Sequence, residues 1–277
     1  MRKHRTGTVL FAERATEAWE ARLSAEDRSL AHQVGEAVEN RAFHVHYQPV
    51  FSVSDRNVVG VEALLRWDAS AGRISPARFV PLLESMGLIV PVGEWVLAEA
   101  CREVASWPQP DGSGFLTVNV SARQLVPGFA DMVIGTVAAA GFPAHRLCLE
   151  LTNPARIADP VAAWGELRRL KACDIRLFID DFGTAGASIV DLKHFLIDAV
   201  KIDGSFIKGL GQQEDDDAIV TALVNLAHAL GMSAIAEGVE TEAQLEYLQT
   251  LGCELVQGFL LGAPGSGAQV SSLFRAT

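Results

Sequence analysis

The sequence is poor in basic residues. Its 23 Lys and Arg residues stand against 34 Asp and Glu residues, which gives a formal net charge of −11. A chain of this kind lacks the broad positive surface that binding to duplex nucleic acid requires, so no nucleic-acid polymer is expected as a partner. A phosphate-bearing ligand would have to be bound through local features or through metal ions.

Cysteine is scarce as well. The four cysteines contain no CxxC pair and are scattered as Cys101, Cys148, Cys173 and Cys253. This spacing is typical of reduced, mostly buried thiols in a cytosolic protein, and it indicates neither a disulfide framework nor a zinc site.

No segment has the pattern of a secretion signal or of a membrane span. The basic start "MRKHRTGTVLF" has no long apolar core and no small-residue cleavage site. The longest apolar segment, residues 218–236, contains Asn225 and His228 and is interrupted at Gly231. A buried helix followed by a buried strand explains this segment better than a membrane helix does. We therefore expect a cytoplasmic location and no membrane contact from this chain.

Short β-rich runs alternate with helical patterns from residue 43 onward. The chain has 277 residues, 49% of them hydrophobic, which is enough for a substantial core. Residues 1–28 are interpreted as a linker or the tail of an upstream element, and residues 29–277 as one domain. Strands are predicted at 43–51, 58–67, 115–121, 146–152, 175–180, 197–203, 232–238 and 253–259. Helices are predicted at 75–87, 93–107, 160–172, 215–231 and 241–252.

This alternation predicts an α/β fold, a (β/α)8 TIM-like barrel with an antiparallel first strand. The turn "SDRN" at 54–57 leaves no room for a helix between the first two strands, so these should pair antiparallel. Thr241 and Ser75 are suited to cap helices, Pro76 to open one and Gly252 to end one. A doubly wound open sheet is the alternative, but no glycine-rich dinucleotide fingerprint follows an early strand.

Polar residues gather at the predicted carboxyl ends of the strands, where parallel barrels collect functional side chains. They are Asn119, Glu150, Asp180, Asp181, Lys201, Glu237 and Gln257, with Glu62 inside the second strand. Converging carboxylates repel one another unless cations join them, and an all-oxygen ligand set suits Mg²⁺ or Mn²⁺. The adjacent Asp180 and Asp181 would let one carboxylate bridge two ions about 3.5–4 Å apart, as in phosphoester cleavage. Separate helix caps and salt bridges are the alternative interpretation.

The segment "VEALLRW" at 61–67 resembles the signature of EAL domains, the phosphodiesterase domains that act on the bacterial second messenger cyclic di-GMP. The resemblance runs over about residues 30–265, because further blocks follow in family order. These blocks are "YQPV" (47–50), "GRISPARFVPLLESMGLI" (72–89), "VNVSARQL" (118–125), "LELT" (149–152), "DDFGT" (180–184), "VKID" (200–203), "IAEGVET" (235–241) and "LGCELVQGF" (251–259).

The resemblance implies hydrolysis of cyclic di-GMP to linear pGpG by a water that two metal ions activate. It assigns metal binding to Glu62, Asn119, Glu150, Asp180, Asp181 and Glu237. It assigns catalytic roles to Lys201, Glu237 and Glu62, and Lys201 is the residue that supports the attacking water. It assigns substrate binding to Gln48, Arg66, Gln257 and Asp181. Asp203, by contrast, is expected to shape the end of its strand and not to bind metal.

Three departures from the family pattern leave other functions open. Asn153 stands where the family has a glutamate, residues 185–187 read AGA where it has GYS, and Ala263 stands where it has an arginine before proline. The alternatives are a receptor that binds cyclic di-GMP with little or no turnover, and a protein-interaction module that has lost the nucleotide. The resemblance is also compatible with a homodimer and with an upstream sensor or cyclase-like domain.

Overall fold

The computed structural model describes residues 24–69, 72–108, 114–152, 157–184 and 196–275. The chain divides into two compact units, one formed by residues 1–44 and 66–89, the other by residues 45–65 and 90–277. Strands β1 (Phe43–Ser52) and β2 (Val58–Ala69) each contribute residues to both units. We describe the two units separately.

The described residues of the first unit form two helices and a small hairpin around three aromatic rings. The end of β2 pairs antiparallel with β3 (Gly72–Ile74), a strand that the sequence analysis did not predict. The helices are α2 (Ala25–Glu39) and α3 (Pro76–Ser85). Pro76 opens α3 as predicted, although the Ser75 side chain makes no capping hydrogen bond. The ring centroids of Phe43, Trp67 and Phe79 lie 5.5–5.8 Å apart and form the core of this unit.

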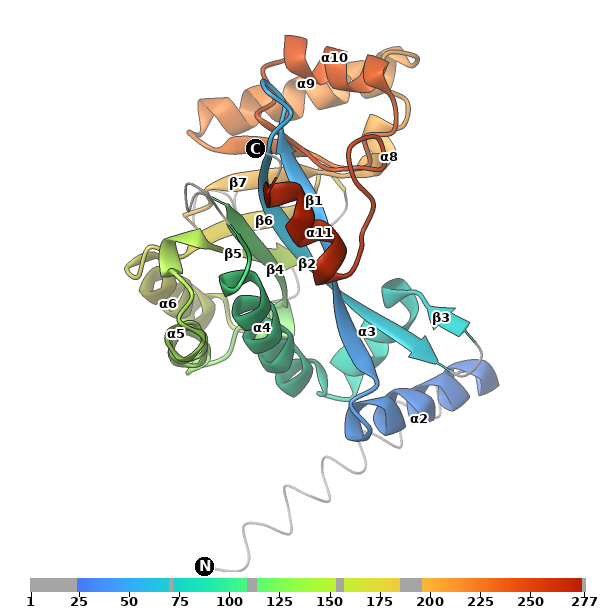
Figure 1. The fold of residues 1–277 in the computed structure, drawn as a ribbon, viewed down its shortest axis with the longest axis vertical. Helices are drawn as coiled ribbons and strands as arrows, with labels where there is room; N and C mark the ends of the chain where they lie inside the picture. The colour runs from blue at the N-terminus through green and yellow to red at the C-terminus, as the bar shows by residue number, and fades with distance from the viewer. Residues whose placement is uncertain (1–23, 70–71, 109–113, 153–156, 185–195, 276–277) are drawn as a thin grey trace, which may run out of the picture. The chain divides into compact units, whose positions relative to one another are not determined.

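The second unit is a closed eight-stranded barrel. Its strands pair in the order β1-β9-β8-β7-β6-β5-β4-β2, and a further pairing of β1 with β2 closes the ring (Figure 1). All neighbours from β2 to β9 are parallel, whereas β1 runs antiparallel to β9. The predicted barrel with its antiparallel first strand is therefore confirmed, and the open-sheet alternative is wrong. The remaining strands are β4 (Phe115–Ser121), β5 (Leu147–Thr152), β6 (Arg176–Phe182), β7 (Ala199–Ile202), β8 (Ser233–Ala236) and β9 (Leu255–Val256).

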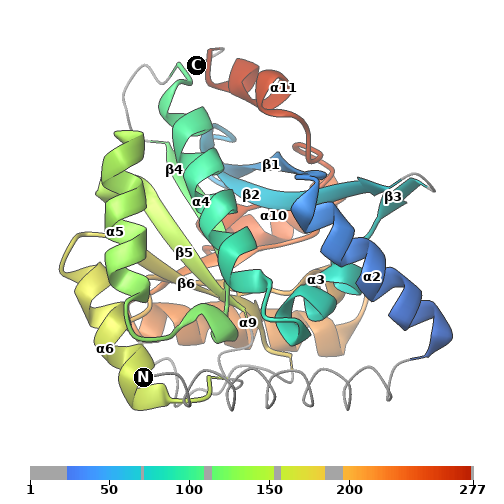
Figure 2. The ribbon, with the colours of Figure 1, turned by 90° about the horizontal axis from the view of Figure 1, so that it is seen from below.

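Helices cover the outside of the barrel. Figure 2 shows α4, α5 and α6 next to one another outside β4–β6. The long helices are α4 (Ile89–Ala105), α5 (Phe129–Ala140), α6 (Pro160–Lys171), α9 (Glu214–Ala229) and α10 (Glu242–Thr250). The short ones are η1 (Ala122–Gln124), η2 (Ala144–Arg146), α8 (Gly204–Ile207), α11 (Gly267–Ser271) and η4 (Ser272–Arg275).

The segment 218–236 is the end of α9 followed by β8, as predicted. Within the described ranges, no helix combines the length and the apolarity that crossing a membrane requires. Thr241 caps α10 in a reciprocal capping box with Gln244, and Gly252 follows the helix with a φ of 76°. Both residues act as the sequence predicted, because a hydroxyl satisfies a free backbone N–H and glycine adopts positive φ without strain.

Candidate active site

Lys201, on β7, is the centre of a buried polar cluster in the barrel. Its side chain is 3% exposed, and its Nζ atom lies 2.9 Å from Glu62 Oε2, 2.6 Å from Glu150 Oε1 and 2.5 Å from Glu237 Oε1. The three carboxylates come from β2, from β5 and from the residue directly after β8. The barrel closure therefore brings together residues that lie 51 and 139 positions from Lys201 in the chain.

Two amide side chains complete the shell around Glu62. Asn119 Nδ2 on β4 donates to Glu62 Oε1 at 2.7 Å, and Gln257 Nε2 just after β9 donates to Glu62 Oε2 at 2.8 Å. These bonds orient the Glu62 carboxylate. The amide oxygen of Gln257 is buried and has no hydrogen-bond partner among the described residues.

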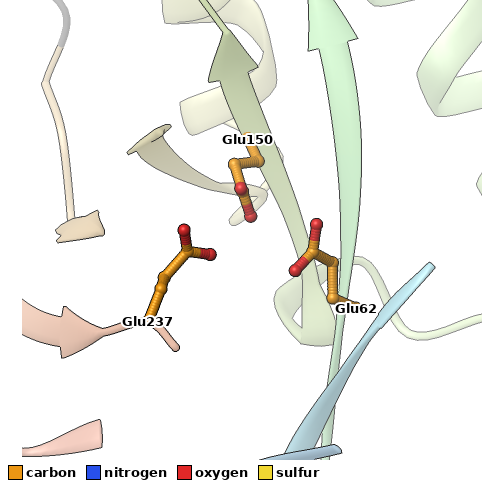
Figure 3. A group of neighbouring side chains, drawn as sticks. All are labelled: Glu62, Glu150 and Glu237. Atoms are coloured by element: carbon orange, nitrogen blue, oxygen red, sulfur yellow. The ribbon is translucent and has the colours of Figure 1, made fainter. Parts of the chain in front are cut away.

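The three glutamates turn their carboxyl groups toward one another, as Figure 3 shows. Three carboxylates face one ammonium, so two negative charges remain uncompensated when all three are ionised. Glu150 is fully buried, and its Oε2 atom has no hydrogen-bond partner within the described part of the chain. A buried oxygen in this state costs free energy unless a proton or a cation meets it.

The titration behaviour of the cluster reflects this charge imbalance. Burial and the neighbouring Glu62 carboxylate raise the pKa of Glu150 well above its usual range. Burial also raises the pKa of Glu237, to about 7, against the opposing effect of Lys201. Although burial opposes both charged forms, the Lys201 ammonium lowers the pKa of Glu62, and the surrounding carboxylates raise that of Lys201. Lys201 and Glu62 therefore stabilise each other's charged forms and are the central ion pair of the cluster.

A second acidic group lies beside the first. Oxygens of Asp180, Asp181 and Glu237 lie within 4.8 Å of one another, as do oxygens of Glu62, Glu150 and Glu237. Glu237 is the carboxyl common to both groups. Partial desolvation and the carboxylates of Asp180 and Asp203 raise the pKa of Asp181 to about 6. The pairing of β6 with β7 shifts register between Ile179 and Phe182, and Asp181 there has a φ of 52°, a strained conformation of a kind typical of functional sites.

The residues fit the divalent cations that the resemblance implies. Every candidate ligand offers oxygen, the donor that Mg²⁺ and Mn²⁺ prefer. A cation would satisfy two buried acceptors that lack a hydrogen-bond partner in the described ranges, Glu150 Oε2 and Gln257 Oε1. The Glu62, Glu150 and Glu237 group would hold one ion, and the Asp180, Asp181 and Glu237 group a second.

Asp203 behaves as the sequence predicted. It stands at the N-cap of α8, where its carboxylate accepts from the backbone N–H of Ser205 at 3.0 Å. Gln48 lies on β1, and its Nε2 donates to the Gly262 carbonyl at 3.3 Å. Arg66 is half-buried on β2, among the residues of the first unit. Asn153 and residues 185–187, which depart from the family pattern, lie outside the described residues.

A close backbone contact that the sequence pattern did not predict places Glu237. Gly238 follows it with a φ of 68°, and a Cβ atom there would lie 3.2 Å from the Cα of Gly204. The loops after β7 and β8 approach each other at backbone distance because both residues lack side chains. A glycine directly after a charged residue at a strand end was the available signal.

Residues 31–264 match the EAL domain family. The chain belongs to the EAL domain family. The match runs over most of the chain and includes the acidic cluster, Lys201 and Gln257.

Named relatives support the same assignment. The chain is 41% identical over 248 residues to the bifunctional diguanylate cyclase/cyclic di-GMP phosphodiesterase MucR of Pseudomonas aeruginosa, a region covering 88% of this chain and 36% of MucR. The chain thus spans about a third of that relative's length. The solved structure of the PaMucR phosphodiesterase in complex with c-di-GMP has 42% identity and a TM-score of 0.80, covering 87% of this chain and 99% of that chain. The EAL domain of Mycobacterium smegmatis DcpA has 35% identity and a TM-score of 0.72, covering 85% and 98%.

Proposed function

We propose that this EAL domain hydrolyses one phosphodiester bond of cyclic di-GMP and releases the linear dinucleotide pGpG, with Mg²⁺ or Mn²⁺ as cofactor. The observation that carries the proposal is the Lys201 ammonium, held within 2.9 Å of three carboxylates at the carboxyl ends of the barrel strands. A structural ion pair would need one partner; a lysine among three acids, two of them fully or almost fully buried, suits a site that handles negative charge.

The resemblance to EAL domains gives each of these side chains a role. Bound cations would lower the pKa of a water and offset the charge that develops on the phosphoryl oxygens. Lys201 supplies a fixed positive charge through Nζ, which orients the attacking water and stabilises negative charge as the water loses its proton. Asn119 and Gln257 hold the Glu62 carboxylate in place. Gln48 and Arg66 bind the dinucleotide, Arg66 as a phosphate partner.

A single assay tests the proposal. The protein is incubated with cyclic di-GMP and either Mg²⁺ or Mn²⁺, and both the release of pGpG and the binding of cyclic di-GMP are followed. We expect pGpG in the presence of the metal and none after chelation. Binding without product would overturn the proposed hydrolysis, and the absence of binding with either metal would overturn any nucleotide function.

A receptor that binds cyclic di-GMP with little turnover is the second candidate. It is favoured by the departures at Asn153 and residues 185–187, because the family loop that these replace shapes the second metal site. Restoring Asn153→Glu together with the family sequence GYSS at residues 185–188 should then raise turnover several-fold, measured as pGpG per minute at saturating metal. Unchanged turnover would show that these departures do not limit the reaction.

We also propose a context for the domain. Residues 1–28 would be a linker or the tail of an upstream element, such as a sensor or cyclase-like domain, that precedes the domain of residues 29–277. The aligned region covers only 36% of MucR, which supports such a context. A cytoplasmic location suits a nucleotide second messenger as substrate, and a homodimer is compatible with the family. Size-exclusion chromatography with light scattering of the chain, with and without cyclic di-GMP, tests the dimer directly.

A further inference from the structure

Tyr47 is a fully buried tyrosine that the proposed reaction does not use. It lies on β1 directly before Gln48, and its hydroxyl donates to Glu103 Oε2 on α4 at 2.8 Å. Burial and the Glu103 carboxylate raise the pKa of this hydroxyl well above its usual range, so the hydroxyl keeps its proton and remains a donor. A buried hydroxyl is costly unless it is bonded, and a carboxylate is a strong acceptor. The bond therefore fixes the residue next to Gln48.

Tyr47 and Gln48 point to opposite faces of β1, because successive residues of a strand alternate. Val50, two residues after Gln48, packs with residues of β4 to β8 in one core cluster, which only a side chain inside the barrel can do. Gln48 therefore faces the interior, and Tyr47 faces outward to α4. Since β1 runs antiparallel to β9, with Phe51 opposite Val256, the residues before Phe51 extend past the carboxyl end of β9. Gln48 thus lies at the edge of the barrel that holds the candidate active site.

A closed ring of contacts connects the backbone of Tyr47 to the side chain of Gln48. Tyr47 exchanges two backbone hydrogen bonds with Gly265, at 2.8 and 2.9 Å. Three residues before Gly265, the Gly262 carbonyl accepts from Gln48 Nε2 at 3.3 Å. A displacement of Tyr47 would therefore move both the backbone of Gln48 and the acceptor of its side chain. An amide has two N–H donors and an oxygen, so this bond orients the group without using its full capacity.

Glu103 holds the same segment, residues 262–267, from the outside of the barrel. A Cβ atom on Gly267 would lie 1.8 Å from Glu103 Oε1, so the chain passes directly over the carboxylate. At the start of the segment, a Cβ atom on Gly262 would lie 2.4 Å from Pro49 Cγ on β1. Both approaches are possible because glycine has no side chain. One carboxylate therefore contacts both the Tyr47 hydroxyl and the segment that orients Gln48.

We propose that the Tyr47–Glu103 hydrogen bond positions Gln48 for contact with bound cyclic di-GMP, which makes Tyr47 and Glu103 positioning residues for substrate binding. The inference rests on the proposed function, in which Gln48 binds the dinucleotide. The bond holds Gln48 in place before the ligand arrives, so less conformational freedom is lost on binding. Lys201 and the candidate metal ligands lie on other strands, so the effect falls on binding and not on the chemical step.

Three substitutions separate the hydrogen bond from the packing around it. Tyr47→Phe keeps the ring and removes the hydroxyl, Glu103→Met removes the acceptor, and Glu103→Gln keeps an acceptor in its place. The matched control is Tyr247→Phe, since Tyr247 is the other tyrosine of the chain and lies half-buried on α10. Thermal melting verifies folding, and the two Glu103 variants decide the question if Tyr47→Phe does not fold.

The affinity for cyclic di-GMP is measured by calorimetry in chelator, and KM and kcat are measured with Mn²⁺. We expect Tyr47→Phe and Glu103→Met to weaken binding by about 5- to 20-fold. Glu103→Gln and Tyr247→Phe should stay within about twofold of the unmodified protein, because Gln still accepts the bond and the control bond does not exist. KM should rise with kcat nearly unchanged, since binding that is equal in ground and transition states affects KM alone. Affinity for Mn²⁺ alone should not change, whereas a general loosening of the barrel would lower it.

A double-mutant cycle with Gln48→Ala tests whether the bond acts through Gln48. Gln48→Ala should weaken the binding of cyclic di-GMP by itself. Adding Tyr47→Phe to it should weaken binding no further, because no Gln48 side chain is left to position. Additive losses in the double variant would overturn the positioning role, and so would unchanged affinity in both Tyr47→Phe and Glu103→Met.

The outcomes distinguish this proposal from the one on which it rests. If the unmodified protein binds cyclic di-GMP but releases no pGpG, hydrolysis is overturned, and the binding series still decides the positioning role. If it binds no cyclic di-GMP with or without Mn²⁺, both proposals are overturned. If Glu103→Gln loses as much affinity as Glu103→Met, or if kcat falls while KM stays constant, the positioning role alone is overturned.

Discussion

At the amino ends of the barrel strands, the Phe115 and Phe178 rings meet edge to face 6.0 Å apart, and the guanidinium of Arg176 lies 5.0 Å from the Phe115 ring centroid. At the carboxyl ends, Lys201 instead meets three carboxylates. Both ends thus contain a cation, but one lies over aromatic faces and the other among acids. The first arrangement fills space and stabilises the fold, whereas the second leaves surplus negative charge that a bound cation would offset.

The largest expected effect is a loss of stability when an aromatic side chain at the amino ends of the barrel strands is truncated. Phe178 is 2% exposed and belongs to the cluster of Val50, Phe115, Cys148, Ala199 and Ile235. Phe178→Ala should lower the free energy of unfolding by about 3–5 kcal/mol, through lost burial and a residual cavity. Urea denaturation measures the loss, with Phe178→Leu as the smaller-cavity control. Turnover per folded molecule should be unchanged, and a large fall in kcat would mean that the two ends are not independent.

Removing the Lys201 ammonium should lower kcat more than it weakens the binding of cyclic di-GMP. Lys201→Ala is expected to lower kcat by about 100- to 1000-fold, or about 2.7–4 kcal/mol, because the fixed positive charge beside the reacting water is lost. Much of the affinity for cyclic di-GMP should remain. Lys171→Ala is the matched control, since Lys171 is a half-buried lysine paired with Asp198 at 2.5 Å and has no proposed role in the reaction. Equal losses in both variants would contradict the assignment of Lys201.

A smaller effect should follow from neutralising one ligand. Glu150→Gln keeps the shape of the side chain but removes the charge, so Mn²⁺ affinity should fall by at least about tenfold. Calorimetric titration of Mn²⁺ without substrate measures this independently of activity. Glu254→Gln serves as the control, because Glu254 accepts from the backbone N–H of Ala234 and interacts with His228 away from the cluster. Unaltered Mn²⁺ affinity in Glu150→Gln would remove Glu150 from the metal site.

The smallest effect is expected for the stability of the protein when Arg176, the cation at the amino ends of the strands, is replaced. Arg176→Met replaces the guanidinium over Phe115 and Phe178 with an apolar side chain of similar length. The free energy of unfolding should fall by about 1 kcal/mol through the lost cation–π contacts, with unchanged kcat. Chemical denaturation and the turnover assay together test this. A stability loss as large as that of Phe178→Ala would assign Arg176 a different structural role.

Much of the fold could be predicted because the buried faces of strands and helices leave a periodic pattern of apolar residues in the sequence. The predicted strand 115–121 and the predicted helix 160–172 agree with β4 and α6 to within a residue. Helix α5 was not predicted, because "FADMVIGTVAAA" is apolar on nearly every face and shows little helical periodicity. Strand β3 is three residues long, too short for any pattern to identify.

The sequence by itself determined the kind of chemistry available: carboxylate and amide oxygens with one lysine at the ends of apolar runs, in an order that parallel strands align at one edge. Only the tertiary structure decided the pairing. Lys201 and Glu62 are 139 residues apart, and ring closure, not local pattern, brings Nζ within 2.9 Å of Oε2. The same packing leaves Glu150 Oε2 without a hydrogen-bond partner in the part of the chain that the structure describes, and it places Asp203 at a helix N-cap and Phe259 at the surface. Hydrogen bonds and burial depend on distances of a few ångströms between remote segments, which strand register and loop contacts set.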